Sequence, residues 1–277
     1  MIHDMAIPPT PYPPRRWIAY AIDPVAWATN ELNFNPDPWQ QEVLRSDGDL
    51  CLVCSRQSGK STTTAVLAAH QAVFFENSTT LVVSPGQRQS TELFRKAAAF
   101  VKTALGSVRL PEDNRLSLTT PHGARIISVP ASDASIRGFS VDLLIADEAS
   151  RIADDIFAAV RPMTAATKGR TALLSTPFGK QGFFASVALG DDNDWRRWLI
   201  AADQCPRISL EFLQQERVLL GQKMFAQEYQ CEFNEADDAA FGFDEISDAF
   251  GALIKGPGSY GVHDDDAVAH VEPAFAN

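Results

Sequence analysis

One stretch, residues 50–62, constrains most strongly what this chain can fold into. An apolar run, Leu50–Cys54, leads into polar residues, and Gly59-Lys60-Ser61 then begins a run with helical character. A strand, a tight loop and a helix that begins at Gly-Lys-Ser form the layout of a phosphate-binding loop. The N–H groups of such a loop and the N-terminus of its helix favour an anion at one point. The sequence therefore predicts a nucleotide site here.

Two residues of this loop have specific expected roles. Lys60 is expected to reach the β- and γ-phosphates, and the Ser61 hydroxyl is expected to hold Mg²⁺. The usual pattern begins with a glycine, whereas this chain has Cys54 at that position, which weakens the match but leaves the strand, loop and helix in place. A chance Gly-Lys-Ser at a helix start is the alternative. The residues expected to bind ATP around the loop are Ser55, Arg56, Gln57, Ser58, Gly59, Lys60, Ser61 and Thr62.

A second stretch with chemical character is the mainly apolar run Val141–Ala146, which ends in Asp147-Glu148. An acidic strand end of this kind is the usual partner of a phosphate-binding loop. Asp147 is expected to hold Mg²⁺, mainly through water, and Glu148 is expected to orient and deprotonate the attacking water. Two adjacent carboxylates at a buried strand end are costly unless a metal or bound water offsets them. Solvated acids at an exposed strand end are the alternative interpretation.

Strands alternate with helices along the chain, which predicts an α/β fold with a mainly parallel central sheet flanked by helices. Functional residues of such a sheet gather at the carboxyl ends of its strands. Residues 107–129 are interpreted as a β-excursion on the sheet edge. Further strands are predicted at Thr79–Ser84, Ser107–Leu110, Leu116–Thr120, Ala124–Val129, Thr171–Ser175 and Trp195–Ile200. Helices are predicted at Trp17–Thr29, Thr62–Phe75, Gln87–Leu105, Asp154–Met163, Leu210–Leu220 and Gln222–Tyr229.

Three further groups of residues are candidates for the nucleotide site. A helix is predicted to begin after Asp37, and its residues Trp39 and Gln40 can pack on an adenine ring and hydrogen-bond to it. Ser175-Thr176 ends a predicted strand, where polar groups can sense the γ-phosphate. Arg137 precedes the acidic strand and can stabilise charge on the transferred phosphate. The respective alternatives are an ordinary amphipathic helix, a structural turn and a solvated arginine.

The net charge of −11 is concentrated near the C-terminus. From Glu235 onward there are ten acidic residues and one lysine, so residues 1–234 carry only about −2. The acidic balance therefore does not exclude a nucleic-acid partner, although the sequence displays no basic path. Of the four cysteines, Cys51 and Cys54 lie on the predicted strand, where core packing is favoured over a redox or metal role. No apolar run is long enough to span a membrane.

Short motifs follow one another in an order that is typical of one family. They are Pro36-x-x-Trp39-Gln40-x-x-Val43-Leu44, Cys54-Ser55-Arg56-Gln57-Ser58-Gly59-Lys60-Ser61, Val83-Ser84-Pro85 with Gln89-Ser90, Arg137-Gly138, Leu144-Ile145-Ala146-Asp147-Glu148-Ala149, Ser175-Thr176-Pro177-Phe178-Gly179-x-x-Gly182-x-Phe184 and Glu228-Tyr229-x-Cys231-Glu232-Phe233. Over roughly residues 30–235 the chain resembles the ATPase domain of the large terminase subunit of tailed bacteriophages, the motor that packages DNA into proheads.

The resemblance implies a P-loop NTPase of the additional-strand, catalytic-glutamate type, with ATP and Mg²⁺ as cofactors. It places Trp39 and Gln40 in the adenine-recognition region, and Ser175-Thr176 in the motif that couples hydrolysis to movement. Arg56 takes the P-loop arginine position, and Arg137 lies where some family members have an arginine that acts on the ATP of a neighbouring subunit. The expected catalytic residues are Glu148, Lys60, Arg56 and Arg137, with Ser61 and Asp147 as metal ligands.

The resemblance also implies ATP-driven translocation of double-stranded DNA into a prohead, in the cytoplasm of an infected bacterium. The implied partners are DNA, the portal protein and the small terminase subunit, without a membrane. A homo-oligomeric ring is implied on the portal, with a monomer in solution as the alternative. A non-catalytic packaging adaptor and a helicase-like translocase are the other functions considered. The intact phosphate loop and acidic pair argue against the non-catalytic adaptor. A helicase-like translocase would require a second motor domain, and none is predicted in this sequence.

The expected organisation has three parts, namely an N-terminal arm and helix at 1–29, an ATPase domain at 30–234 and an acidic linker or tail at 235–277. The end of the ATPase domain, about 195–234, is expected to form a small lid. Large terminases normally continue into a ribonuclease-H-like nuclease, for which the 43 residues after Asn234 in this 277-residue chain are too few. Asp264-Asp265-Asp266 is therefore interpreted as a solvated acidic stretch and not as a metal site.

Overall fold

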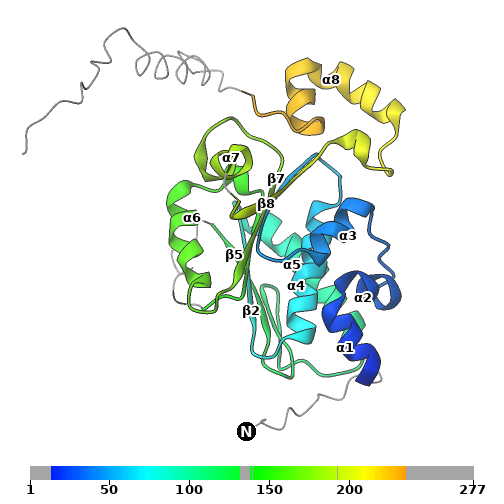
Figure 1. The fold of residues 1–277 in the computed structure, drawn as a ribbon, viewed down its shortest axis with the longest axis vertical. Helices are drawn as coiled ribbons and strands as arrows, with labels where there is room; N and C mark the ends of the chain where they lie inside the picture. The colour runs from blue at the N-terminus through cyan, green and yellow to red at the C-terminus, as the bar shows by residue number, and fades with distance from the viewer. Residues whose placement is uncertain (1–13, 132–137, 139, 192, 235–277) are drawn as a thin grey trace, which may run out of the picture. The chain divides into compact units, whose positions relative to one another are not determined.

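The computed structural model describes residues 14–131, 138, 140–191 and 193–234. Within them an eight-stranded sheet has the strand order β3-β4-β5-β2-β6-β7-β1-β8 (Figure 1). The strands are β1 Asp49–Cys54, β2 Thr79–Ser84, β3 Glu112–Asp113, β4 Ser117–Thr119, β5 Arg125–Pro130, β6 Leu143–Asp147, β7 Arg170–Ser175 and β8 Trp195–Ile200.

The sheet is parallel except at one edge. The strands β5, β2, β6, β7, β1 and β8 pair in parallel, whereas β3 with β4 and β4 with β5 pair antiparallel. This confirms the predicted α/β fold and its β-excursion on the sheet edge. The strand β7 lies between β1, which precedes the phosphate loop, and the acidic strand β6. The carboxyl ends of these three parallel strands therefore meet at one edge of the sheet.

Helices cover both faces of the sheet (Figure 1). None of the described helices is long and apolar enough to cross a membrane. The α-helices are α1 Pro14–Ile22, α2 Pro24–Glu31, α3 Pro38–Arg45, α4 Lys60–Phe74, α5 Gln87–Leu105, α6 Asp154–Val160, α7 Gly182–Leu189 and α8 Leu210–Tyr229. Short 3₁₀-helices are η2 Ala149–Arg151, η3 Arg161–Thr164 and η4 Ala202–Gln204.

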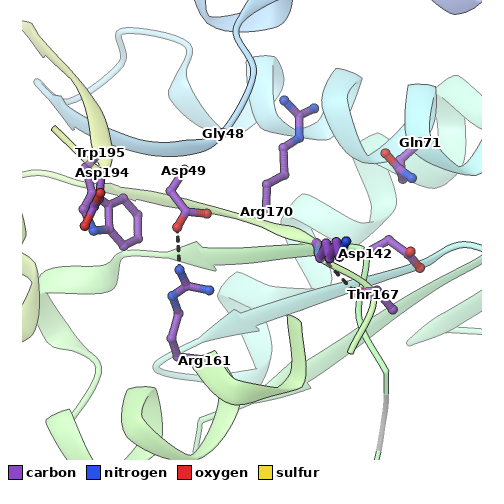
Figure 2. Close-up of a pocket in the computed structure, with 11 residues that line it drawn as sticks. Gly48, Asp49, Gln71, Asp142, Arg161, Thr167, Arg170, Asp194 and Trp195 are labelled. Atoms are coloured by element: carbon purple, nitrogen blue, oxygen red, sulfur yellow. Dashed lines mark hydrogen bonds and ion pairs between the residues drawn. The ribbon is translucent and has the colours of Figure 1, made fainter. Parts of the chain in front are cut away.

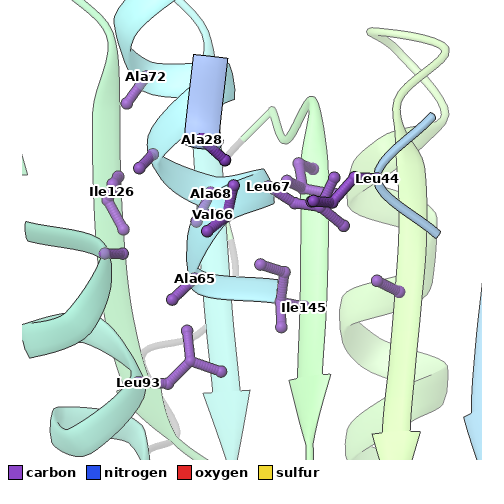
Figure 3. Close-up of a cluster of buried hydrophobic side chains, with 14 of the residues drawn as sticks. Ala28, Leu44, Ala65, Val66, Leu67, Ala68, Ala72, Leu93, Ile126 and Ile145 are labelled. Carbon is purple, nitrogen blue, oxygen red and sulfur yellow. The ribbon is translucent and has the colours of Figure 1, made fainter. Parts of the chain in front are cut away.

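Alternation along β1 divides the core into two layers. Leu50 and Leu52 belong to a layer that includes residues of α2, α3, α4 and α5. Cys51 and Val53 face the other layer, which includes residues of α6 and α7. Successive strand residues point to opposite faces, so a strand covered on both faces is apolar throughout. Figure 3 shows the first layer, in which small side chains of α4 such as Ala65 lie against the sheet.

The N-terminal segment is built differently from the prediction. The predicted helix Trp17–Thr29 is wrong, because α1 ends at Ile22 and α2 begins at Pro24. The Asp23 carboxylate accepts hydrogen bonds from the N–H groups of Val25 and Ala26 at 3.0 and 3.3 Å, which caps the second helix. The second helix contributes a fully buried tryptophan to the first core layer.

Other elements differ less from the prediction. Ser107–Leu110 is not a strand, and its apolar side chains pack on the core from an irregular segment. The two helices predicted at Leu210–Leu220 and Gln222–Tyr229 are confirmed, because the backbone of α8 is not helical at Gly221, where φ is 73°. The helix predicted after Asp37 is confirmed as α3. The strand β8 belongs to the main sheet, so any lid formed by the C-terminal part would begin after it.

Candidate active site

The phosphate loop connects β1 to α4 and includes two residues with positive φ. These angles are 58° at Gln57 and 96° at Gly59. A residue other than glycine rarely adopts this conformation, and backbone strain of this kind clusters at ligand-binding sites. The conformation of the loop therefore supports the anion-binding role that its sequence predicts.

The loop is attached to the end of β8 and to α8. The N–H of Ser55 donates to the Ile200 carbonyl at 2.9 Å, and the N–H of Arg56 donates to the Glu228 carbonyl at 3.0 Å. Within the loop, the Ser58 hydroxyl donates to the Ser55 carbonyl at 3.0 Å. The position of the loop therefore depends on residues from the C-terminal part of the described chain.

Lys60 and Glu148 form an ion pair, with 3.4 Å between Nζ and Oε1. Glu148 directly follows β6 and has a left-handed backbone with φ of 52°. Both side chains are largely buried, which weakens the screening of their charges by water. The pair joins the phosphate loop to the acidic strand end, as the two motifs predicted.

Asp147 lies buried at the end of β6, and its pKa is raised to about 6. Burial is the largest cause and the charge of Glu148 adds to it, while Lys60 acts in the opposite direction. A carboxylate in this environment is strongly stabilised as an anion by a nearby cation. Carboxylate and hydroxyl oxygens suit Mg²⁺, so Asp147 and Ser61 fit a magnesium site that water and phosphate oxygens would complete. Among the described residues, no group of three or more His, Cys, Asp and Glu is arranged to hold a metal.

A cavity of about 530 Å³ lies beside these groups. It is lined by residues of the phosphate loop, the starts of α4 and α5, η2 and the positions directly after β6 and β7. Its size is in the range of small-molecule sites. The cavity therefore unites residues that were predicted separately. Its lining residues are Arg56, Gln57, Lys60, Gln89, Glu148, Arg151 and Thr176.

The predicted coupling residues contact the segment that follows the acidic strand. The Ser175 hydroxyl shares a hydrogen bond of 2.7 Å with the Ser150 hydroxyl of η2. The guanidinium carbon of Arg151 lies 4.2 Å from the centroid of the Phe178 ring, which is a cation–π geometry. Thr176 lines the cavity. Two contacts therefore link η2 to the end of β7 and to the segment that follows it.

Arg56 is paired within its own chain. Its Nε donates to Glu228 Oε2 at 2.6 Å, and its Nη2 donates to Oε1 at 3.3 Å. The Glu228 side chain is only 5% exposed, whereas that of Arg56 is 59% exposed. Arg56 therefore connects the phosphate loop to α8, and its catalytic role stays a prediction. The competing arginine, Arg137, lies outside the described residues.

Trp39 and Gln40 are both buried, but only one of them lies against the loop. Trp39 packs in the first core layer. A Cβ atom on Gly59 would lie 2.8 Å from Gln40 Nε2 and 3.0 Å from Arg207 Nη2, so these two side chains lie directly on the Gly59 backbone. Glycine is therefore required there by close approach as well as by its positive φ. The adenine-binding roles of Trp39 and Gln40 stay predictions.

Sequence reasoning gave no role to Gln89, Arg151 and Arg207. Gln89 stands in one of the quoted motifs, and Arg151 follows the acidic pair closely in the chain, so each had a local signal. Arg207 had none, because its contacts with the loop arise only from the fold.

A larger cavity, of about 710 Å³, lies at the opposite edge of the sheet, where the strands begin (Figure 2). Asp49 Oδ2 lies 2.5 Å from Arg161 Nη2, and its Oδ1 accepts a hydrogen bond from a backbone N–H of β7 at 2.6 Å. Asp142 accepts from a backbone N–H of β2 at 2.7 Å, and Arg170 donates to the carbonyl of residue 46 at 2.7 Å. These charges have fixed structural partners, and none of them belongs to the predicted site.

Comparison with known families decides the assignment. The family model described as "Terminase large subunit, T4likevirus-type, N-terminal" matches residues 51–248. The chain belongs to this terminase family. The match includes the phosphate loop, the acidic pair and the coupling residues, and it confirms the resemblance inferred from the motifs. A search of curated protein sequences gave no significant match.

Solved structures of phage terminases share the fold of this chain. The ATPase domain of the Thermus phage P74-26 large terminase has a TM-score of 0.67 and 22% identity, and the alignment covers 76% of this chain and 99% of that one. The HK97 bacteriophage large terminase has a TM-score of 0.64 and 14% identity, with 77% and 55% covered. The large terminase of a thermophilic bacteriophage, in complex with ATP-gamma-S, has a TM-score of 0.55 and 14% identity, with 77% and 52% covered. This terminase therefore spans about half the length of the latter two chains.

Proposed function

We propose that this terminase hydrolyses ATP with Mg²⁺ at the cavity beside the phosphate loop, and that hydrolysis drives double-stranded DNA into a phage prohead. The observation that carries this proposal is the 3.4 Å ion pair between Lys60 and Glu148. It brings the cation expected to bind the γ-phosphate and the expected general base to one point. A structural salt bridge would not require a buried acid such as Asp147 beside it.

The ion pair suggests how the residues act when ATP binds. Lys60 exchanges Glu148 for the γ-phosphate, which carries more negative charge, and Glu148 is then free to accept a proton from the attacking water. Asp147 and Ser61 would hold Mg²⁺, which supplies charge stabilisation on the phosphate oxygens. Arg56 is the candidate for a further cation within the same subunit, and Arg137 for one supplied to a neighbouring subunit.

The contacts after β6 and β7 support a coupling role for Ser175 and Thr176. Loss of the γ-phosphate would alter the position of Glu148, and the hydrogen bond between Ser150 and Ser175 would pass this change to β7. The residues after β8, as far as residue 234, are the candidate lid, because they bind the phosphate loop through Arg56 and its backbone.

The wider function follows from the family. We propose that the chain acts as a homo-oligomeric ring on the portal in the infected bacterial cytoplasm, with the small terminase subunit as a further partner. We expect this 277-residue polypeptide to show no metal-dependent cutting of plasmid DNA. Asp264-Asp265-Asp266 lies outside the described residues, and its interpretation as a solvated stretch stays a prediction.

A phosphate-release assay tests the proposal. The purified chain should release phosphate from ATP with Mg²⁺ and stop when EDTA is added, and Lys60→Ala should abolish turnover. Lys102→Ala is the matched control, because Lys102 pairs with Asp113 on the surface, away from the loop, and its loss should leave turnover unchanged. Equal turnover in wild type and Lys60→Ala would overturn the assignment of the site.

A further inference from the structure

Arg207 lies between η4 and α8 and contacts two separate segments of the chain. Its Nη2 donates to the carbonyl oxygen of Ser58, in the phosphate loop, at 2.8 Å. Its Nη1 donates to Asp37 Oδ1 at 3.0 Å, and its Nη2 lies 2.8 Å from Asp37 Oδ2. One guanidinium group therefore binds the loop and the residue that precedes α3 at the same time.

Asp37 in turn fixes the glutamine that lies on the loop. The N–H of Asp37 donates to Gln40 Oε1 at 2.8 Å, and the Gln40 amide nitrogen packs over Gly59 beside the Arg207 guanidinium. Gly59 is thus covered by two side chains that are both connected to Asp37. This arrangement joins the regions before α3 and before α8 to the phosphate loop, although they lie far apart in sequence.

We infer that Arg207 is a positioning residue of the nucleotide site, which holds the phosphate loop and the start of α3 in the arrangement that binds ATP. The inference rests on the proposed ATPase function. A planar guanidinium can make both contacts at once, which a lysine ammonium cannot do with the same geometry. The Asp37 side chain is 13% exposed and that of Arg207 is 48% exposed, so water screens the pair only in part.

The expected consequence concerns binding more than chemistry. Arg207 does not line the cavity that contains Lys60 and Glu148, so we expect its loss to weaken ATP binding more than it slows the chemical step. It removes one charge-assisted contact to a loop carbonyl and one partly exposed ion pair. Together these predict a rise of about threefold to tenfold in the KM for ATP and in the Kd for ATP-gamma-S, with kcat changed less than about twofold.

The test compares Arg207→Ala, Arg207→Lys and Asp37→Asn with wild type, by steady-state kinetics and by calorimetric titration with ATP-gamma-S. Arg207→Ala should raise KM and Kd in parallel, Arg207→Lys should restore part of the loss, and Asp37→Asn should have the same direction of effect. Arg196→Ala is the matched control, since Arg196 is an exposed arginine on β8, and it should match wild type.

The outcomes separate this inference from the proposed function. A wild type that neither binds nor hydrolyses ATP overturns both. Normal wild-type turnover with unchanged KM and Kd in Arg207→Ala overturns the positioning role alone. A fall in kcat without a change in KM or Kd also overturns it. If Arg207→Ala does not fold, the same readouts on Arg207→Lys and Asp37→Asn decide the question.

Discussion

The two edges of the sheet carry charged groups of different kinds. At the edge where the strands begin, Asp49 and Arg170 bind backbone groups or a neighbouring charge at 2.5 to 2.7 Å, around the cavity of about 710 Å³. At the edge where the strands end, Lys60 and Glu148 are 3.4 Å apart, and Asp147 is buried with a raised pKa beside a smaller cavity. Cavity size therefore does not identify the functional edge. The two edges differ instead in whether their charged groups have close structural partners.

The physical reason lies in the parallel sheet. Loops after the carboxyl ends lead into helix N-termini, whose free N–H groups attract anions, so charges placed there can serve a ligand. Charged side chains at the opposite edge form hydrogen bonds with backbone groups where strands begin, so they stabilise the fold. The two edges should respond differently to substitution, and four experiments test this difference, from the largest expected effect to the smallest.

Glu148→Gln should reduce kcat by about 10²–10⁴-fold, because an amide cannot accept the proton of the attacking water. ATP binding should be retained, since Lys60 would no longer be shared with a carboxylate. Phosphate release and binding of ATP-gamma-S measure the two effects separately. Turnover like that of wild type would move the general base to another residue.

Acidification should lower the stability of the fold through His70, which lies in the C-terminal part of α4, away from the phosphate loop. This histidine is buried, and its pKa is lowered to about 4, mainly by burial. Between about pH 6.5 and 4 the unfolded chain binds a proton that the folded chain does not. The free energy of unfolding therefore decreases as the pH is lowered through this range. The shift from 6.5 to about 4 corresponds to a loss of about 3 kcal/mol. Urea unfolding at pH 7 and pH 5 should show a weaker pH dependence in His70→Gln than in wild type.

Asp49→Ala should lower the free energy of unfolding by about 2 kcal/mol, because a backbone N–H of β7 and Arg161 both lose their acceptor. The kcat of the folded enzyme should not change. Asp49→Asn, which keeps an acceptor for the N–H group, should lose less stability. A drop in kcat at full folding would show that this edge takes part in function, and it would break the comparison.

Glu228→Gln tests a close ion pair at the carboxyl edge, in which Arg56 Nε lies 2.6 Å from Glu228 Oε2. It should cost about 1 kcal/mol of stability, because the Arg56 pair is partly exposed and the amide keeps one acceptor. We expect kcat to change less than about threefold. A loss as large as that of Glu148→Gln would instead place the Arg56 and Glu228 pair in the chemistry.

Much of the site could be predicted because its signals are local. The phosphate loop and the pair Asp147 and Glu148 each follow an apolar strand, and α5, β2 and β8 have the predicted bounds. A strand or an amphipathic helix repeats its pattern within a few residues, so sequence alone displays it. The break between α1 and α2 was missed because an apolar pattern continued across Pro24.

The sequence by itself determined the α/β fold class, the phosphate loop and the acidic strand end, because backbone preference and side-chain alternation act between near neighbours. Only the tertiary structure decided that Arg56 binds Glu228, 172 residues away, and that Arg207 binds Ser58, 149 residues away. Such contacts depend on which strands are neighbours in the sheet, and β1 lies next to β8 although about half of the chain separates them. No local pattern encodes that adjacency, since it arises from the packing of the whole core.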